Sequence, residues 1–72
     1  MIRFRENINL TVITEYDEEK DNIVEDSEVL FKAGERVDGD IYFDDGSDWV
    51  DLQFGDGSVA NSVERNSFEI IS

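Results

Sequence analysis

Much of the chain alternates between apolar and polar residues with a period of two. From Ile8 to Tyr16 every second residue is apolar, β-branched or aromatic, and the alternation returns in residues 37–43, 50–54 and 58–63. A period of two places every second side chain on one face of a β-strand. These segments therefore predict four strands, and a fifth, short strand is predicted at residues 68–71, after a single helical turn at residues 64–67.

Short turns with glycine separate these strands. Gly34 lies in the turn 32–35, an Asp-Gly pair lies in 44–47, and Gly55-Asp56-Gly57 has the length of a tight hairpin turn. Five or six short strands joined in this way predict an all-β fold, a small antiparallel barrel. The predicted core is the set of inward-facing apolar residues: Leu10, Val12, Phe31, Val37, Ile41, Val50, Leu52, Phe54, Val59, Val63, Phe68 and Ile70.

The length of 72 residues allows one domain, so residues 1–72 are expected to form a single barrel. A chain of this size buries only about 60% of its unfolded surface, which argues against a deep catalytic pocket. Residues 1–7 are predicted to be either an added edge strand or a disordered segment.

The charge is strongly negative and unevenly placed. Nineteen acidic residues face six basic ones, a net charge of −13. In residues 15–28 eight acids are opposed by Lys20 alone, and this concentration predicts a solvated acidic loop over residues 16–28. A second acidic group, which includes Asp44, Asp45 and Asp48, contains no base. Such charge repels nucleic acids and anionic membranes, so we expect neither as a direct partner.

The acidic surface has two interpretations. It keeps a small protein soluble and monomeric, or it serves as a functional polyanion. A charge of −13 exceeds the magnitude of about 2 to 8 that suffices for solubility, and it destabilises the folded state by self-repulsion. This cost favours a functional surface by a small margin.

The missing residue types exclude much chemistry. There is no cysteine and no histidine, so disulfides, thiolate zinc sites, thiol nucleophiles and the commonest general base are all absent. We expect no catalysis, no cofactor and a cytoplasmic location without an export signal. Asp44, Asp45 and Asp48, with Asp38 or Asp40, offer oxygen ligands for calcium, but the twelve-residue calcium loop is not present.

The order of segments from residue 8 to residue 71 resembles a Src homology 3 domain, or the bacterial and phage relatives of that barrel. Residues 11–16 and 17–28 are similar to its first strand and long acidic loop, residues 29–37 to the segment before its next strand, and Ser47-Asp48-Trp49-Val50 to the segment with the groove tryptophan. Gly55-Asp56-Gly57 resembles its distal hairpin, and residues 64–67 resemble its short helical turn.

The resemblance implies a groove for proline-rich peptides, of which Trp49 and Tyr16 match two aromatic positions. Glu64 and Ser67 replace the proline and the tyrosine of the helical turn, so this function carries over poorly. The alternation places Trp49 on the outer face, either as an anchor for a partner or as a cover over a barrel edge beneath the acidic loop. Tyr16 and Tyr42 have the same two interpretations, with the structural one favoured.

The sequence leads to two main functional hypotheses, beside the simpler one of a structural accessory protein of a phage or mobile element. The first is a monomeric, non-catalytic interaction module that binds a basic protein. Its expected binding residues are Tyr16, Asp17, Glu18, Glu19, Asp21, Asp44, Asp45, Asp48 and Trp49. The second is an acidic mimic of nucleic acid, of phage or mobile-element type, that occupies a DNA- or RNA-binding protein.

Overall fold

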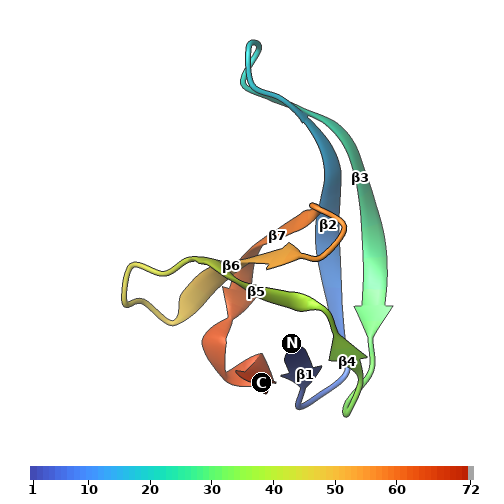
Figure 1. The fold of residues 1–72 in the computed structure, drawn as a ribbon, viewed down its shortest axis with the longest axis vertical. Coiled ribbons are helices and arrows are strands. Elements are labelled where there is room, and N and C mark those ends of the chain that lie inside the picture. The colour runs from blue at the N-terminus through green and yellow to red at the C-terminus, as the bar shows by residue number, and fades with distance from the viewer. Residues whose placement is uncertain (72) are drawn as a thin grey trace.

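The computed structural model describes residues 1–71, which form two antiparallel sheets (Figure 1). Ser72, the last residue of the predicted domain, lies outside the described residues. The elements are β1 (Ile2–Phe4), β2 (Ile8–Asp17), β3 (Asn22–Phe31), β4 (Arg36–Val37), β5 (Gly39–Phe43), β6 (Trp49–Phe54), β7 (Val59–Glu64), the 3₁₀ turn η1 (Arg65–Ser67) and β8 (Phe68–Ile70). The predicted all-β, antiparallel fold and the helical turn are confirmed.

The strand order is β4-β1-β8 in the smaller sheet and β3-β2-β7-β6-β5 in the larger one. β3 and β5 are the outer strands of the five-stranded sheet, and within residues 1–71 they are not paired with each other. The larger sheet therefore has an open seam between its two edges. No helix within residues 1–71 has the length and apolar character needed to cross a membrane.

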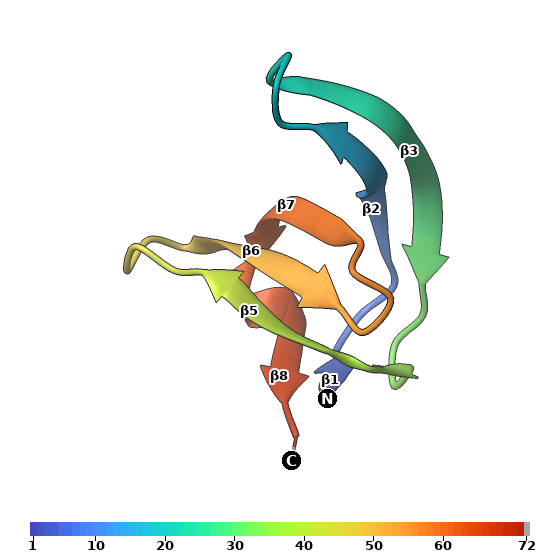
Figure 2. The same ribbon diagram turned by 45° about the horizontal axis from the view of Figure 1, so that its top comes forward.

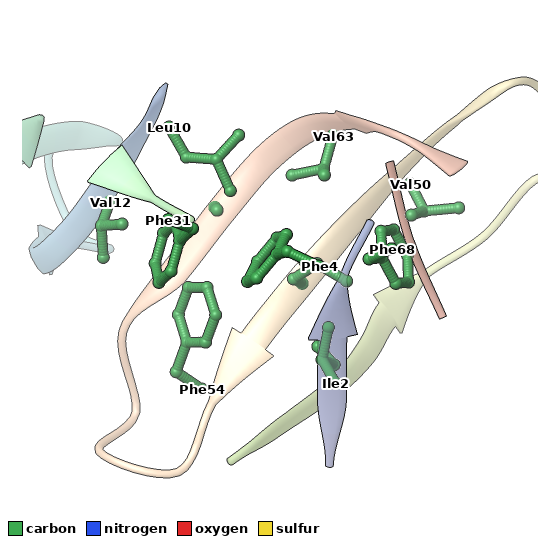
Figure 3. Packing of buried hydrophobic residues seen from close by; sticks show 11 residues of the cluster. Ile2, Phe4, Leu10, Val12, Phe31, Val50, Phe54, Val63 and Phe68 are labelled. Carbon is green, nitrogen blue, oxygen red and sulfur yellow. The ribbon is translucent and has the colours of Figure 1, made fainter. Parts of the chain in front are cut away.

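The core lies between the two sheets (Figure 3). Phe4, Phe31 and Phe54 form a stack at its centre, with ring centroids 4.6 Å and 5.7 Å apart. Eight predicted core residues are buried: Leu10, Val12, Phe31, Val50, Leu52, Phe54, Val63 and Phe68. Val37 and Ile41 pack against this cluster and are partly buried.

Two predicted core residues are not in the core. Val59 pairs with Ile13 and Gln53 on the outer face of the sheet, because an irregularity in the β6–β7 register and the positive φ of Ser62 (58°) shift the alternation by one residue. Ala60 consequently takes the buried position. Ile70 is 49% exposed because it ends β8, which is an edge strand of the smaller sheet.

The N-terminal segment differs from both predictions made for it. β1 is the central strand of the smaller sheet, with β4 on one side and β8 on the other, so it is neither disordered nor an edge strand. Ile2 and Phe4 alternate with Arg3 and are almost fully buried. β1 therefore pairs the N-terminal segment with the C-terminal strand β8, and its side chains form part of the core.

The predicted strand 37–43 is two strands in two sheets. β4 pairs with β1, whereas β5 pairs with β6, and Asp38 lies between them. Gly39 begins β5 at a tightly packed position, where a Cβ would lie 3.0 Å from the carbonyl oxygen of Gln53 and 3.2 Å from the Ile2 side chain. A register irregularity after Ile41 leaves Phe43 exposed.

The predicted acidic loop 16–28 is in fact the outer part of the β2–β3 hairpin. We call residues 15–28 the acidic arm; its turn comprises only residues 18–21. β2 pairs with β7 only at Val12 and Ile13, so beyond these residues the arm leaves the sheet and curves over it (Figure 2). Pairing within the hairpin satisfies the backbone while water solvates the charged side chains, so the acids do not prevent strand formation.

Candidate functional site

A groove of about 450 Å³ lies between the acidic arm and the outer face of the five-stranded sheet. The arm contributes Tyr16, Glu18 and Ile23, and the sheet contributes Ile13, Val59 and Tyr42 together with the polar residues Gln53 and Asn61. The groove therefore has a largely apolar and aromatic lining, to which the arm adds the carboxylate of Glu18.

Strand pairing brings these residues together. Tyr16 and Ile23 are cross-strand partners in the arm, and Ile13 and Val59 are partners between β2 and β7. Register irregularities between Ile13 and Tyr16 interrupt the β2–β3 ladder. Bulges of this kind bend a strand and increase its twist, which accounts for the curve of the arm over the sheet (Figure 2).

The aromatic and aliphatic side chains of the groove are only half covered. Tyr16 is 47% exposed, Ile23 46% and Tyr42 64%. Single exposed apolar residues are ordinary, but a group that lines one concave surface is typical of a binding site. The groove thus provides apolar surface that the fold itself leaves unburied.

The charge of the arm is not neutralised by the described part of the protein. Its eight acids form no ion pair within residues 1–71, whereas Arg3 and Arg5 pair with Glu69, and Arg65 pairs with Asp44. Glu15 and Glu25 are direct cross-strand partners, and like charges in that position repel each other. The arm is therefore a local source of unfavourable electrostatic energy.

The turn of the arm has its own hydrogen bonds. The N–H groups of Glu19 and Lys20 donate to the Asp17 side chain at 3.0 Å and 3.3 Å, and Asp21 adopts a positive φ of 51°. The Tyr16 hydroxyl donates to the Asp21 carboxylate, and this hydrogen bond raises the pKa of Tyr16. Asp17 and Asp21 thus shape the turn, while Glu18 lines the groove and Glu19 is exposed.

The second acidic group lies in the β5–β6 turn, residues 44–48. Arg65 donates to both carboxylate oxygens of Asp44, at 2.8 Å and 2.5 Å, and lowers the pKa of Asp44 to about 2. Asp45 accepts a hydrogen bond from the Ser47 N–H at 3.0 Å, and its contacts with Ser47 lower its pKa. These carboxylates stay ionised at neutral pH and suit ion pairing rather than proton transfer.

Trp49 begins β6 and is 55% exposed, so its predicted outward orientation is confirmed. The backbone N–H of Trp49 donates a hydrogen bond to the Ser47 hydroxyl oxygen at 3.2 Å. Trp49 does not line the groove beneath the arm, but it lies on the same outer face of β6 as Gln53, which does.

The predicted binding residues therefore form two groups at the ends of two hairpins. Tyr16, Asp17, Glu18, Glu19 and Asp21 belong to the arm, and Asp44, Asp45, Asp48 and Trp49 belong to the β5–β6 turn and the residue after it. The two hairpin ends point in different directions in Figures 1 and 2. Within residues 1–71 no three acidic side chains are grouped so that they could hold a metal ion.

The sequence did not identify Ile13, Ile23 and Val59 as groove residues. Ile13 and Ile23 are apolar residues at positions that alternation assigns to a solvent face or to a loop. They could have been found if the arm had been predicted as a hairpin, because Tyr16 then pairs with Ile23.

Comparison of the chain with protein-family models, with curated proteins and with solved structures found no match. Function is therefore inferred from the groove, its exposed side chains and the charge around it.

Proposed function

We propose that this protein is a non-catalytic interaction module that binds a basic partner protein through the groove beneath the acidic arm. The proposal rests on two features that occur together. Tyr16, Ile23 and Tyr42 line one groove and are each about half exposed or more, and the acids of the adjoining arm form no ion pair within residues 1–71. A basic partner with apolar side chains complements both features.

Binding would offset two costs of the fold. Burial of the groove's apolar surface contributes about 25 cal/mol per Å², and cations placed beside Glu15 and Glu25 relieve the repulsion between them. Tyrosine and tryptophan are enriched among the residues that dominate interface affinity, while charges on an interface rim mainly speed association. We therefore assign affinity to the groove and encounter rate to the arm.

Trp49 and the acids Asp44, Asp45 and Asp48 form the second contact region in this proposal. Trp49 follows the groove along the outer face of β6, so a partner that fills the groove and continues along this strand reaches it. A Trp49→Ala variant with an unchanged Kd for the partner would remove this region from the proposal.

We also infer that the two sheets are a variant of the Src homology 3-like barrel, in a cytoplasmic monomer. Two features support this inference about the fold: the protruding β2–β3 hairpin and the 3₁₀ turn η1 before the last strand, β8. Binding of proline-rich peptides is not proposed. Ser67, at the position of the groove tyrosine, is fully buried, and its hydroxyl donates to the Glu64 carbonyl oxygen at 2.6 Å.

The experiment is affinity capture from host lysate with the tagged full chain, followed by a challenge with excess duplex DNA at constant salt. Retention of a captured basic protein supports protein recognition by the groove. Release by DNA would indicate that the carboxylates imitate phosphates, which is the mimicry hypothesis. The Kd of the purified partner is then measured at two salt concentrations. A Kd that does not change with salt contradicts the role of the arm.

A further inference from the structure

A second concave site lies in the open seam of the larger sheet, on the inner side of the fold. A pocket of about 360 Å³ opens between β3, the β4–β5 link and the β6–β7 turn. Its walls are Val12, Val29, Phe31, Val37 and Phe54. We call it the seam pocket. It is separate from the groove, because none of its lining residues lines the groove.

The aromatic stack of the core ends at this pocket. The three rings of the stack are shown in Figure 3. Of these, only Phe31 and Phe54 line the seam pocket, and each retains a small exposed fraction, 6% and 8%. Part of each ring therefore borders the pocket, and a planar group that enters the pocket can pack against it. The guanidinium group of arginine packs on aromatic faces in this way.

Two carboxylates lie at the rim of the apolar walls. Asp56 accepts hydrogen bonds from the Ser58 N–H (2.9 Å) and hydroxyl (2.5 Å), so it is committed to the turn and its pKa is lowered. Asp38 is exposed, and its side chain accepts no hydrogen bond from residues 1–71. Its carboxylate is free to bind a cation.

Gly55 allows the Asp38 carboxylate to take this position. The Gly55 N–H donates to the Asp38 carbonyl oxygen at 2.9 Å, and a Cβ on Gly55 would collide with an oxygen of the Asp38 carboxylate. Any other residue at position 55 would force the Asp38 side chain to rotate away. The glycine therefore permits close packing of an anionic side chain beside an apolar pocket.

We propose that the seam pocket accepts an arginine side chain of a protein partner, with the guanidinium stacked on Phe54 and paired with Asp38. The aliphatic part of the side chain packs against Val29 and Val37. Arginine fits better than lysine, because only arginine combines a planar stacking face with forked donors for a carboxylate. The net charge of −13 disfavours an anionic occupant. This site goes beyond the proposed function, because it lies outside the groove.

The test is an NMR titration of the ¹⁵N-labelled full chain with N-acetyl-arginine methylamide, with the lysine and citrulline analogues as comparison ligands. Citrulline keeps the shape of arginine without its charge. We expect saturable shifts of the amides of Val29, Val37 and Gly55 with arginine, at least fivefold weaker binding of lysine and none of citrulline. Equal responses to arginine and citrulline, or shifts confined to the acidic arm, would overturn the proposal.

Three variants locate the binding. Asp38→Asn removes the carboxylate charge, whereas Gly55→Ala keeps the net charge and displaces the carboxylate. Both are expected to weaken arginine binding at least fivefold. Glu6→Gln makes the same charge change outside the arm, the groove and the seam pocket, and is expected to leave binding unchanged. Equal weakening in Glu6→Gln and Asp38→Asn would indicate general electrostatic attraction and refute the site. Failure here would leave binding through the groove intact, since the groove shares no residue with this pocket.

Discussion

At the scale of single residues, the position in the sheet decides what a side chain contributes. Ile2 and Ile70 are cross-strand partners, yet Ile2 is fully buried and Ile70 is 49% exposed. Ile2 lies on the central strand of its sheet and Ile70 ends an edge strand. The same residue type therefore has two different energetic roles.

Ile2→Ala is expected to reduce the free energy of unfolding by about 2–5 kcal/mol, because it removes buried methyl groups and leaves a cavity. Ile70→Ala, the matched control, is expected to change it by less than about 0.5 kcal/mol. Urea denaturation of both variants measures the difference. Similar losses in the two variants would contradict the central position of β1.

The Asp44–Arg65 pair predicts a specific pH dependence. The pKa of Asp44 is about 2 in the folded protein, below its ordinary value of 3.8. The pair therefore contributes stability above pH 3.8 that is lost as the pH falls through 2. ¹³C NMR titration of the Asp44 carboxyl should give a midpoint near 2, and Arg65→Gln should return it toward 3.8. A midpoint near 3.8 in the unmodified protein would show that the pair does not form.

At the scale of elements, alternation located most strands. β2, β6, β7 and β8 begin and end within about two residues of their predicted limits, since each has apolar residues on one face. β1 was predicted only as one of two alternatives, and as an edge strand, because three residues are too few for a period to be recognised. The arm was predicted to be a loop because its many acidic residues indicate a solvated segment. Its β-branched and aromatic residues nevertheless pair across the hairpin.

Within the arm, the repulsion between Glu15 and Glu25 is expected to lower the stability of the folded protein. Glu15→Lys replaces the Glu15–Glu25 repulsion with an attractive cross-strand pair, and is expected to raise the free energy of unfolding by about 0.2–1 kcal/mol. Glu6→Lys makes the same change in net charge outside the arm and is expected to have a smaller effect. Thermal unfolding compares the two, and an equal gain would assign the effect to net charge rather than to the pair.

At the scale of the whole molecule, two sheets enclose one core, and two hairpins extend from the larger sheet (Figure 1). The groove is assembled from β2, β3, β5, β6 and β7, so no local pattern in the sequence could predict it. Its position depends on the bulged arm and on the shift in alternation at Ser62 that turns Val59 outward. The net charge, by contrast, could be read from composition alone.

The central claim is that the groove beneath the acidic arm binds the partner. Ile23 and Leu30 test it as a matched pair, because both lie on β3 and are 46% and 49% exposed, but only Ile23 lines the groove. The Kd of each alanine variant is measured for the partner recovered by capture. We expect Ile23→Ala to weaken binding about tenfold, a loss of about 1.4 kcal/mol, and Leu30→Ala to stay within about twofold. Equal affinities of the two variants would contradict the claim.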